Sequence, residues 1–259
     1  MPVEQRARVN VLGVGIDAVD MSAAVSRILD AARSRRGGYV CVTGVHGIME
    51  AQRDPSFRRI LNESLVTTPD GMPMVWLGKL AGFRRIERVY GPDLMLEICR
   101  ASVELGATHY LYGGNEGVAE DLASKLRTRF PRIRIVGTFT PPFRALHADE
   151  ERRLAQELEG LRPDFFWIGL STPKQERFMA EYRGRLPLNI MVGVGAAFDM
   201  HSGRTKQAPR WMQRMGLEWC FRLLQEPRRL FKRYATNNPT FIWSVLLQQI
   251  GIRQYTLGS

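Results

Sequence analysis

The 259-residue sequence predicts an α/β protein with a Rossmann-like, mainly parallel sheet, helices on both faces and a basic helical appendage at the C-terminus. Two observations predict this fold. Short apolar runs typical of buried strands alternate with amphipathic runs typical of helices, up to about residue 198. Beyond that point the strand-like runs stop, and basic, aromatic helical runs follow. Such an alternation is the usual pattern of a parallel sheet covered by helices.

The expected strands are short runs rich in β-branched and aromatic residues, which favour a pleated, buried surface. They cover Val9–Ile16, Tyr39–Val42, Leu65–Thr68, His109–Tyr112, Ile133–Gly137, Phe165–Leu170 and Asn189–Val194. The expected helices repeat apolar residues at every third or fourth position, so that one face is buried. They cover Met21–Ser34, His46–Arg53, Pro73–Leu80, Asp93–Leu105, Glu116–Phe130, Asp149–Leu161 and Pro173–Tyr182, followed by Arg210–Gln225, Arg228–Tyr234 and Pro239–Ile250.

The length of the chain suits one large domain with an appendage. We expect a catalytic domain over residues 1–200, and a helical appendage over residues 201–259 that completes the site and contacts the membrane. The apolar run Phe241–Ile250 is far shorter than the ~20 residues that span a bilayer, so we expect only peripheral membrane contact.

The N-terminus lacks the apolar stretch of a secretory signal, and the three cysteines have no paired spacing. A cytoplasmic protein with reduced thiols is therefore expected.

The net charge of +11 is concentrated near the C-terminus. From Arg204 to Ser259 the chain carries ten Lys or Arg residues against two Glu residues. A patch of this sign can bind phosphate groups, nucleic acid or an anionic membrane surface. Charge alone leaves these three kinds of partner open.

One carboxylate stands at a turn between a strand-like run and a helical run, in the segment Thr67-Thr68-Pro69-Asp70-Gly71-Met72-Pro73. Ligands of open α/β sheets bind at the carboxyl ends of the strands. A single base at such a place suits an enzyme that removes one proton from a hydroxyl nucleophile. A purely local role for Asp70, as an Asx turn or a helix N-cap, is the alternative.

Glycine-rich or polar turns close four of the expected strands, at Thr43-Gly44, Asp70-Gly71, Gly113-Gly114 and Gly193–Gly195. Glycines let backbone N–H groups approach a ligand, and a helix N-terminus favours anionic oxygens. Converging strand ends are what a ligand crevice requires. A tight turn with Asn115 as helix N-cap explains Gly113-Gly114 equally well. Close packing is the alternative for Gly193 and Gly195.

Another strand-to-helix junction reads Gly169-Leu170-Ser171-Thr172-Pro173-Lys174-Gln175-Glu176. Thr172 at the N-cap, Pro173 at the first helical position and Gln175 at the third predict a capping box. A capping box does not explain why Lys174 and Glu176 also cluster there. These side chains are candidates for contacts with nucleotide or sugar hydroxyls.

Arg222 and Arg229 are seven residues apart, which is about two helical turns if one helix continues through Pro227. On one helix they would share a face and could clamp a diphosphate, because guanidinium groups match phosphate oxygens. A solvated helix face is an equal alternative for each arginine.

The sequence has no DxD motif, no His, Cys and Asp cluster at metal-ligand spacing, and no GxSxG or GxGxxG motif. The four histidines are isolated from one another. We therefore expect neither a bound metal nor another cofactor.

Four blocks of the chain resemble one known family. They read TPDGMPMVW at Thr68–Trp76, ERVYGPDL at Glu87–Leu94, GLSTPKQE at Gly169–Glu176, and GVGAAFD leading to APRWMQRMGLEWCFRLLQEPRRL within Gly193–Leu230. In order and spacing they are similar to the WecB/TagA/CpsF glycosyltransferases, glycosyltransferase family 26, over residues 8–233. The resemblance implies a Rossmann-like domain and an inverting, metal-independent transfer from a UDP-sugar to a polyprenyl-diphosphate-linked sugar. The type activity is N-acetylmannosaminyl transfer in bacterial cell-wall teichoic acid or common-antigen synthesis, and relatives transfer hexoses in exopolysaccharide biosynthesis.

The resemblance also implies roles for individual residues. The general base proposed for the family falls on Asp70, and its active-site threonine, arginine and glutamine fall on Thr43, Arg88 and Gln175. Its appendage arginines fall on Arg222 and Arg229, and Lys232 or Arg233 takes a third basic place. The family often reads Thr-Pro-Asn where this chain has Thr43-Gly44-Val45, so an amide is missing and His46 follows.

The leading hypothesis is a cytoplasmic glycosyltransferase at the inner face of the cell membrane. Asp70 would deprotonate the acceptor hydroxyl, Thr43 and Gln175 would orient substrates, and Arg88 would neutralise diphosphate charge. Substrate-binding roles are expected for Gly71, Gly113, Gly114, Asn115, Lys174, Glu176, Gly193, Gly195, Arg222, Arg229, Lys232 and Arg233.

The main alternative is a basic nucleic-acid-binding α/β protein, because Trp211, Trp219, Phe221, Phe231 and Tyr234 interleave with arginines as in proteins that stack on bases. A nicotinamide-linked oxidoreductase is disfavoured by the missing GxGxxG motif. The expected partners are a UDP-sugar and a lipid-linked sugar rather than nucleic acid, and a homo-oligomer is left open.

Overall fold

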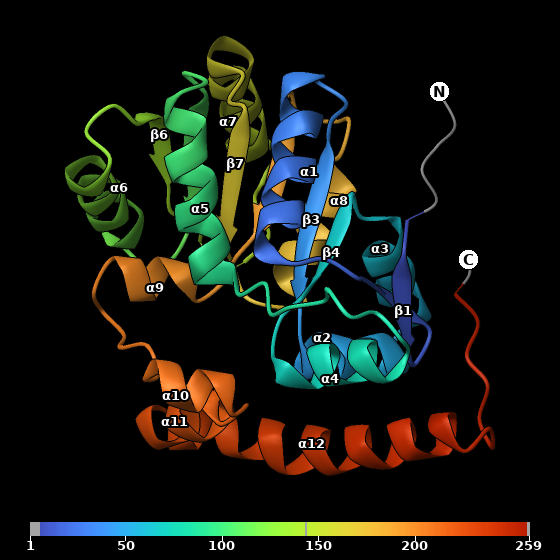
Figure 1. Cartoon of the computed structure of the whole chain (residues 1–259). Helices are drawn as coiled ribbons and strands as arrows, with labels where there is room; N and C mark the ends of the chain where they lie inside the picture. The colour runs from blue at the N-terminus through green and yellow to red at the C-terminus, as the bar shows by residue number, and fades with distance from the viewer. Residues whose placement is uncertain (1–5, 143, 258–259) are drawn as a thin grey trace. The chain divides into compact units, whose positions relative to one another are not determined.

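A computed structural model describes residues 6–142 and 144–257, and it confirms the α/β prediction (Figure 1). Six strands form a parallel sheet in the order β4-β3-β8-β7-β5-β6, and a separate antiparallel hairpin pairs β1 with β2. The chain divides into two compact units. The first unit comprises the described parts of Met1–Met21, Val42–Tyr90 and Gln207–Ser259, and the second comprises those of Ser22–Cys41 and Gly91–Lys206.

The second unit contains most of the sheet and the helices that connect its strands. Its strands are β5 (Thr108–Gly113), β6 (Arg134–Phe139), β7 (Phe165–Gly169), β8 (Ile190–Gly193) and the first four residues of β3 (Gly38–Thr43). Its helices are α1 (Met21–Arg33), α5 (Gly91–Val103), α6 (Val118–Arg129), α7 (Ala148–Leu161), α8 (Lys174–Tyr182) and the short α9 (Ala197–His201). Apart from α9, each lies where the hydrophobic pattern predicts it.

The first unit contains the hairpin, the edge strand β4 with the last two residues of β3, and the C-terminal helices. Its strands are β1 (Arg8–Val11), β2 (Val14–Asp17) and β4 (Val66–Pro69). Its helices are α2 (Val45–Arg53), α3 (Pro55–Glu63), α4 (Met72–Leu80), α10 (Arg210–Arg214), α11 (Glu218–Gln225) and α12 (Pro227–Gln249).

Near the N-terminus one prediction is wrong, and one helix was not predicted. The run Val9–Ile16 is a hairpin, because Leu12 and Gly13 adopt φ values of 51° and 83° and reverse the chain between β1 and β2. Helix α3 was not predicted, although its start carries a clear signal. The Asp54 carboxylate accepts hydrogen bonds from the backbone N–H groups of Ser56 and Phe57, and Pro55 stands in the first turn.

The predicted break near Pro239 is also wrong, because α12 continues through this residue. Its buried residues Leu230, Asn237, Phe241 and Ser244 recur at spacings of seven, four and three positions, which puts them on one face. Helix α12 packs on α2, as Figure 1 shows, so tertiary packing outweighs the hydrogen bond that proline cannot make. Over residues 6–142 and 144–257, no helix is long and apolar enough to cross a membrane.

Stacked aromatic rings fix α8 in the second unit. Tyr112 of β5 stacks on Phe178 of α8 with ring centroids 4.8 Å apart, and Phe178 in turn contacts Tyr182 at 4.5 Å. Phe166 of β7 lies beside the same rings. The N-terminus of α8, which carries Gln175 and Glu176, is therefore anchored by the body of its own helix.

A fully buried histidine lies on the other face of β5. His109 Nδ1 accepts a hydrogen bond from the indole N–H of Trp167 at 3.0 Å, and its Nε2 lies 2.9 Å from the Ser102 hydroxyl oxygen. Because Ser102 donates its own proton to the Cys99 carbonyl, the imidazole must donate from Nε2 and is neutral. Burial lowers the pKa of His109 to about 4.

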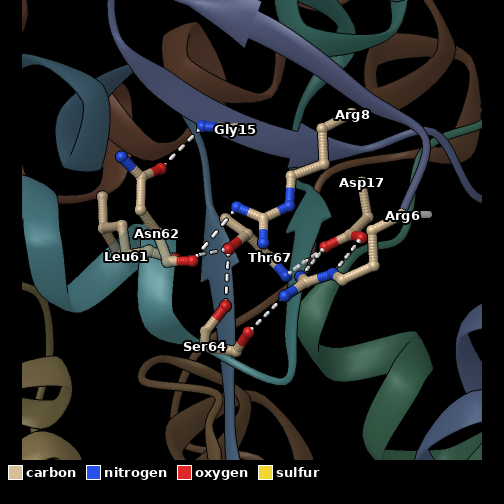
Figure 2. A network of polar contacts seen from close by, with 8 residues as sticks. All are labelled: Arg6, Arg8, Gly15, Asp17, Leu61, Asn62, Ser64 and Thr67. Carbon is tan, nitrogen blue, oxygen red and sulfur yellow. Dashed lines mark hydrogen bonds and ion pairs between the residues drawn. The ribbon is translucent and has the colours of Figure 1, made fainter. Parts of the chain in front are cut away.

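A buried carboxylate joins the N-terminal hairpin to β4 in the first unit (Figure 2). Asp17 is fully buried and forms a bidentate ion pair with Arg6, with Nε and Oδ1 3.0 Å apart. It also accepts the backbone N–H of Thr67 at 2.7 Å. The Thr67 hydroxyl donates to the Leu61 carbonyl and contacts Ser64. These contacts fix β4 three residues before Asp70.

We expect Asp17→Asn to lower the free energy of unfolding by roughly 3 kcal/mol, because it leaves the Arg6 guanidinium without its counter-charge. Urea denaturation at pH 7 measures this change. Asp30→Asn removes an ion pair with Arg33 that is exposed on both sides, and it should cost less than about 1 kcal/mol. Equal losses for the two variants would contradict the structural role of Asp17.

The buried His109 should make stability depend on acid pH. An unfolded histidine takes up a proton below its ordinary pKa of 6.5, whereas the folded one resists protonation down to about 4. The stabilisation is complete above pH 6.5 and is lost as the pH falls to about 4, by roughly 3 kcal/mol in total. Urea denaturation between pH 7 and pH 4.5 should show that His109→Gln loses less stability on acidification than the wild type does. Parallel pH profiles would contradict this.

Candidate active site

Asp70 directly follows β4 and is held against the end of β3. Its backbone N–H donates to the carbonyl oxygens of Thr43 and Thr68, each at 3.0 Å. Gly44 lies so close that a Cβ on it would be 2.6 Å from the Asp70 carbonyl oxygen. Any side chain at residue 44 would therefore push the two strand ends apart. The backbone of Asp70 is thus fixed, while its side chain is only partly buried.

The alternative role of Asp70 as a helix N-cap is wrong. The N-cap residue of α4 is Gly71, which has a φ of 98°. A φ in this region favours glycine. Asp70 therefore precedes the N-cap position of α4 and does not occupy it.

Thr43 is the last residue of β3 and belongs to the same unit as Asp70. The residue is 2% exposed, and no described residue forms a hydrogen bond with its Oγ1. Buried hydroxyls nearly always have a partner, so an orphan of this kind marks a place for a ligand or a water molecule. A hydroxyl can both donate and accept, which suits either a sugar hydroxyl or a phosphate oxygen.

Arg88 lies on the segment that follows α4 and is engaged by the C-terminal helices. Its Nη1 donates to Gln213 Oε1 at 2.8 Å, and its Nη2 pairs with Glu218 of α11. The guanidinium carbon lies 4.0 Å above the centre of the Tyr90 ring. Only about a seventh of either charged side chain is exposed, at 14% for Arg88 and 15% for Glu218. This ion pair is therefore shielded from solvent.

Tyr90 links this ion pair to the catalytic candidate. Burial raises the pKa of the Tyr90 hydroxyl well above its usual range, the charge of Glu218 and a hydrogen bond to it add to the increase, and the charge of Asp70 contributes further. Tyr90 is therefore a neutral donor at any physiological pH. Its backbone neighbour Val89 donates its N–H to the Pro69 carbonyl at 3.0 Å, which fixes this segment along the end of β4.

Tyr90, Gln213 and Glu218 were not predicted from the sequence as site residues. Tyr90 lies inside the ERVYGPDL block, so its place in that motif was an available signal. The two others pair with Arg88 across 125 and 130 positions of the chain. No local pattern could have identified them.

The four appendage residues expected to bind phosphate, Arg222, Arg229, Lys232 and Arg233, lie in the first unit but not on one helix. Glu226 adopts a φ of −133° between α11 and α12, so Arg222 and Arg229 lie on separate helices and the condition for a shared helix face is not met. Arg229 makes two hydrogen bonds with Glu226 and lowers the pKa of that carboxylate. Burial and then the charge of Arg229 lower the pKa of Arg233, and Arg222 adds to this effect. Lys232 is exposed on α12.

Close packing accounts for the two glycines at the end of β5 in the second unit. Gly113 has a φ of 128°, and a Cβ on it would lie 2.8 Å from the backbone of Gly169. A Cβ on Gly114 would lie 2.7 Å from Val118. Asn115 is exposed and is not the N-cap of α6, which is Gly117 in a left-handed conformation. The alternative that gave Asn115 this role is wrong.

The start of α8 brings Gln175 and Glu176 against the end of β8 in the same unit. The predicted capping box is absent, because Pro173 is the N-cap residue and the Thr172 hydroxyl donates to Glu176 Oε1 at 2.8 Å instead. The Gln175 amide also donates to Glu176 Oε1, at 3.1 Å. Gly193 packs closely against this helix, since a Cβ there would lie 2.9 Å from the Met179 methyl carbon and 3.0 Å from Gln175 Nε2.

The predicted site residues therefore fall into two groups, one in each unit. The first unit holds Thr43, Asp70, Gly71, Arg88, Arg222, Arg229, Lys232 and Arg233, and the second holds Gly113, Gly114, Asn115, Lys174, Gln175, Glu176, Gly193 and Gly195. Direct contacts join Asp70 to Thr43 in the first group and Gln175 to Glu176 in the second. Lys174 and Asn115 are exposed.

Residues 9–255 match the Glycosyl transferase WecG/TagA/CpsF family. Two similar proteins carry the name N-acetylglucosaminyldiphosphoundecaprenol N-acetyl-beta-D-mannosaminyltransferase. The one from Bacillus subtilis (strain 168) is 30% identical over 199 residues, which cover 77% of this chain and 75% of that protein. The one from Bacillus spizizenii is 28% identical over 211 residues, which cover 82% and 79%. The match extends over nearly the whole chain and includes both groups of site residues, and the chain belongs to the WecG/TagA/CpsF family of glycosyltransferases.

Proposed function

We propose that this glycosyltransferase moves N-acetylmannosamine, or a related hexose, from a UDP-sugar to a sugar linked to a polyprenyl diphosphate. The observation that carries the proposal is the position of Asp70 in a family member, where its backbone is hydrogen-bonded to Thr43 at the strand ends. The names of the two relatives support the acceptor and the transferred sugar, since both describe transfer of N-acetylmannosamine to a lipid-linked N-acetylglucosamine. Family membership favours this function over the alternative of a nucleic-acid-binding protein.

The chemistry proposed for Asp70 is that of a single general base. Its carboxylate removes the proton of the acceptor hydroxyl as the oxygen attacks the anomeric carbon of the donor. The bond from that carbon to the diphosphate breaks, and UDP leaves with the electron pair. Direct displacement of this kind inverts the configuration at the anomeric carbon. We assign to Thr43 the role of holding a substrate hydroxyl or phosphate oxygen, and its buried Oγ1, which has no partner among the described residues, supports this role.

The charge that develops on UDP needs cationic stabilisation. We assign this role to Arg88, Arg222, Arg229 and the basic pair Lys232 and Arg233. In the structure Arg88 pairs with Glu218 and Arg229 pairs with Glu226. A phosphate group at either arginine would therefore exchange with a carboxylate, which preserves the charge balance of the guanidinium.

The C-terminal helices also present the features of a peripheral membrane surface. Apolar side chains that are at least half exposed lie on α11 and α12: Leu224, Phe231, Ile242, Trp243 and Leu246. They accompany the basic residues of the same segment. Exposed apolar groups mixed with basic residues favour contact with an anionic bilayer. This surface suits an enzyme whose acceptor is held in the cytoplasmic leaflet by its polyprenyl chain.

We expect Asp70→Asn to lower turnover by 10²- to 10⁴-fold or more, roughly what a general base contributes, while UDP still binds. Transfer is measured with UDP-N-acetylmannosamine and a lipid-linked N-acetylglucosamine acceptor, and UDP binding is measured by calorimetry. Glu63→Gln, at an exposed position of the same unit, changes the net charge equally and should leave turnover unchanged. Near-normal turnover of Asp70→Asn would contradict the proposed base.

We expect the double variant Ile242→Ser and Trp243→Ser to weaken binding to vesicles that contain anionic lipid by about tenfold, because two large apolar side chains lose their burial in the bilayer. Vesicle flotation measures the bound fraction. Leu105→Ser removes an exposed apolar side chain of the second unit and serves as the control. Unchanged binding of the double variant would argue against α12 as the membrane surface.

A further inference from the structure

Gln175 and Glu176 are two polar residues that are almost completely enclosed at the start of α8, with 3% and 1% of their surfaces exposed. Both hydrogen bonds from side chains go to one oxygen of Glu176, its Oε1. The other oxygen, Glu176 Oε2, and the amide oxygen of Gln175 are buried and have no partner among the described residues. Two orphaned polar oxygens at one site need an explanation, because each costs free energy when it stays unpaired.

The surroundings of Glu176 favour a neutral carboxylic acid. The groups that reach its carboxyl are the Thr172 hydroxyl, the Gln175 amide and its own backbone N–H, and all three are uncharged. Lys174 and Arg177, the nearest basic residues in sequence, are exposed. An isolated carboxylate at full burial would be strongly disfavoured. Burial accordingly raises the pKa of Glu176, and the three hydrogen bonds offset part of that increase.

The contact with Glu176 fixes which way the Gln175 amide points. Its nitrogen donates to Glu176, so the amide oxygen faces elsewhere. Gly195 lies beside this buried oxygen, because a Cβ built on it would be 3.4 Å away. The oxygen can accept hydrogen bonds and cannot donate them. A ligand that reaches it must bring an N–H or O–H group and displace its present cover.

We propose that Glu176 acts as a neutral acid that positions Gln175, and that the Gln175 amide oxygen accepts a hydrogen bond from an uncharged N–H or O–H group of the UDP-sugar. This proposal rests on the proposed function for the identity of the ligand. Glu176 is a positioning residue, because it acts through Gln175. The group that is recognised belongs either to the nucleotide or to the sugar, and both offer donors of this chemistry. A buried acceptor of this kind disfavours analogues that lack the donor.

The protonation state of Glu176 can be tested without any ligand. A neutral acid in the folded state must ionise on unfolding, so the wild type loses stability as the pH rises above the ordinary carboxyl pKa of 4.5. Glu176→Gln keeps an acceptor and a donor but cannot ionise, so its stability relative to the wild type should increase from pH 5 to pH 8 in urea denaturation. Glu181→Gln, at an exposed position on the same helix, should follow the wild type. A constant difference between Glu176→Gln and the wild type would overturn the neutral acid.

The ligand part is tested by calorimetric titration with UDP and with UDP-N-acetylmannosamine. Gln175→Met keeps the size of the side chain but removes the acceptor, and it should weaken binding about tenfold. Glu176→Leu should weaken binding to a similar degree, and Glu176→Gln should recover most of that loss. A loss with both ligands assigns the contact to the nucleotide, and a loss with the nucleotide sugar alone assigns it to the sugar.

Unchanged affinity of Gln175→Met for both ligands would overturn the role of Gln175. A wild-type protein that binds neither ligand would overturn the UDP-sugar assignment and with it the proposed function. The urea series decides the state of Glu176 separately, so the two failures can be told apart.

Discussion

The contact between the ends of β3 and β4 is the constraint on which the catalytic candidate depends. One backbone hydrogen bond of 3.0 Å joins Asp70 to Thr43, and Gly44 keeps the space between them free of a side chain. A carboxylate that removes a proton must keep its distance to the substrate within a fraction of an ångström. The backbone of Asp70 is held in place by this hydrogen bond, while its side chain stays partly accessible. The buried pair of Arg6 and Asp17 supports the same strand from the opposite end.

The two groups of site residues differ in the kind of polarity that they offer. In the first unit, the arginines carry full charges, glutamates pair with two of them, and Asp70 adds a carboxyl group. In the second unit, Gln175 and Glu176 lie in an enclosed and uncharged setting. Charged groups suit proton removal and a departing diphosphate, whereas neutral hydrogen-bonding groups suit the recognition of a base or a sugar.

The pairing of Arg88 with Glu218 gives the C-terminal helices a role beyond surface charge. The ion pair joins the ERVYGPDL block to α11, and Tyr90 couples it to the electrostatic surroundings of Asp70. Removing one partner from a shielded pair costs more than the pair itself contributes, because the remaining charge stays buried. The segment that exposes apolar side chains is thus connected, within the first unit, to the residues next to the proposed base.

The sequence by itself determined the α/β alternation, the turn position of Asp70 and the family blocks, because hydrophobic period, turn residues and motif order are local properties. Only the tertiary structure decided the pairings of Arg88, which reach across 125 and 130 positions. It also decided that α12 passes through Pro239, since burial against α2 outweighs local propensity. Propensity and motifs act between neighbours in the chain, whereas burial and ion pairing act between neighbours in space. The orphaned oxygens of Thr43, Gln175 and Glu176 belong to the second kind, because a polar atom loses its partners only when the chain packs around it.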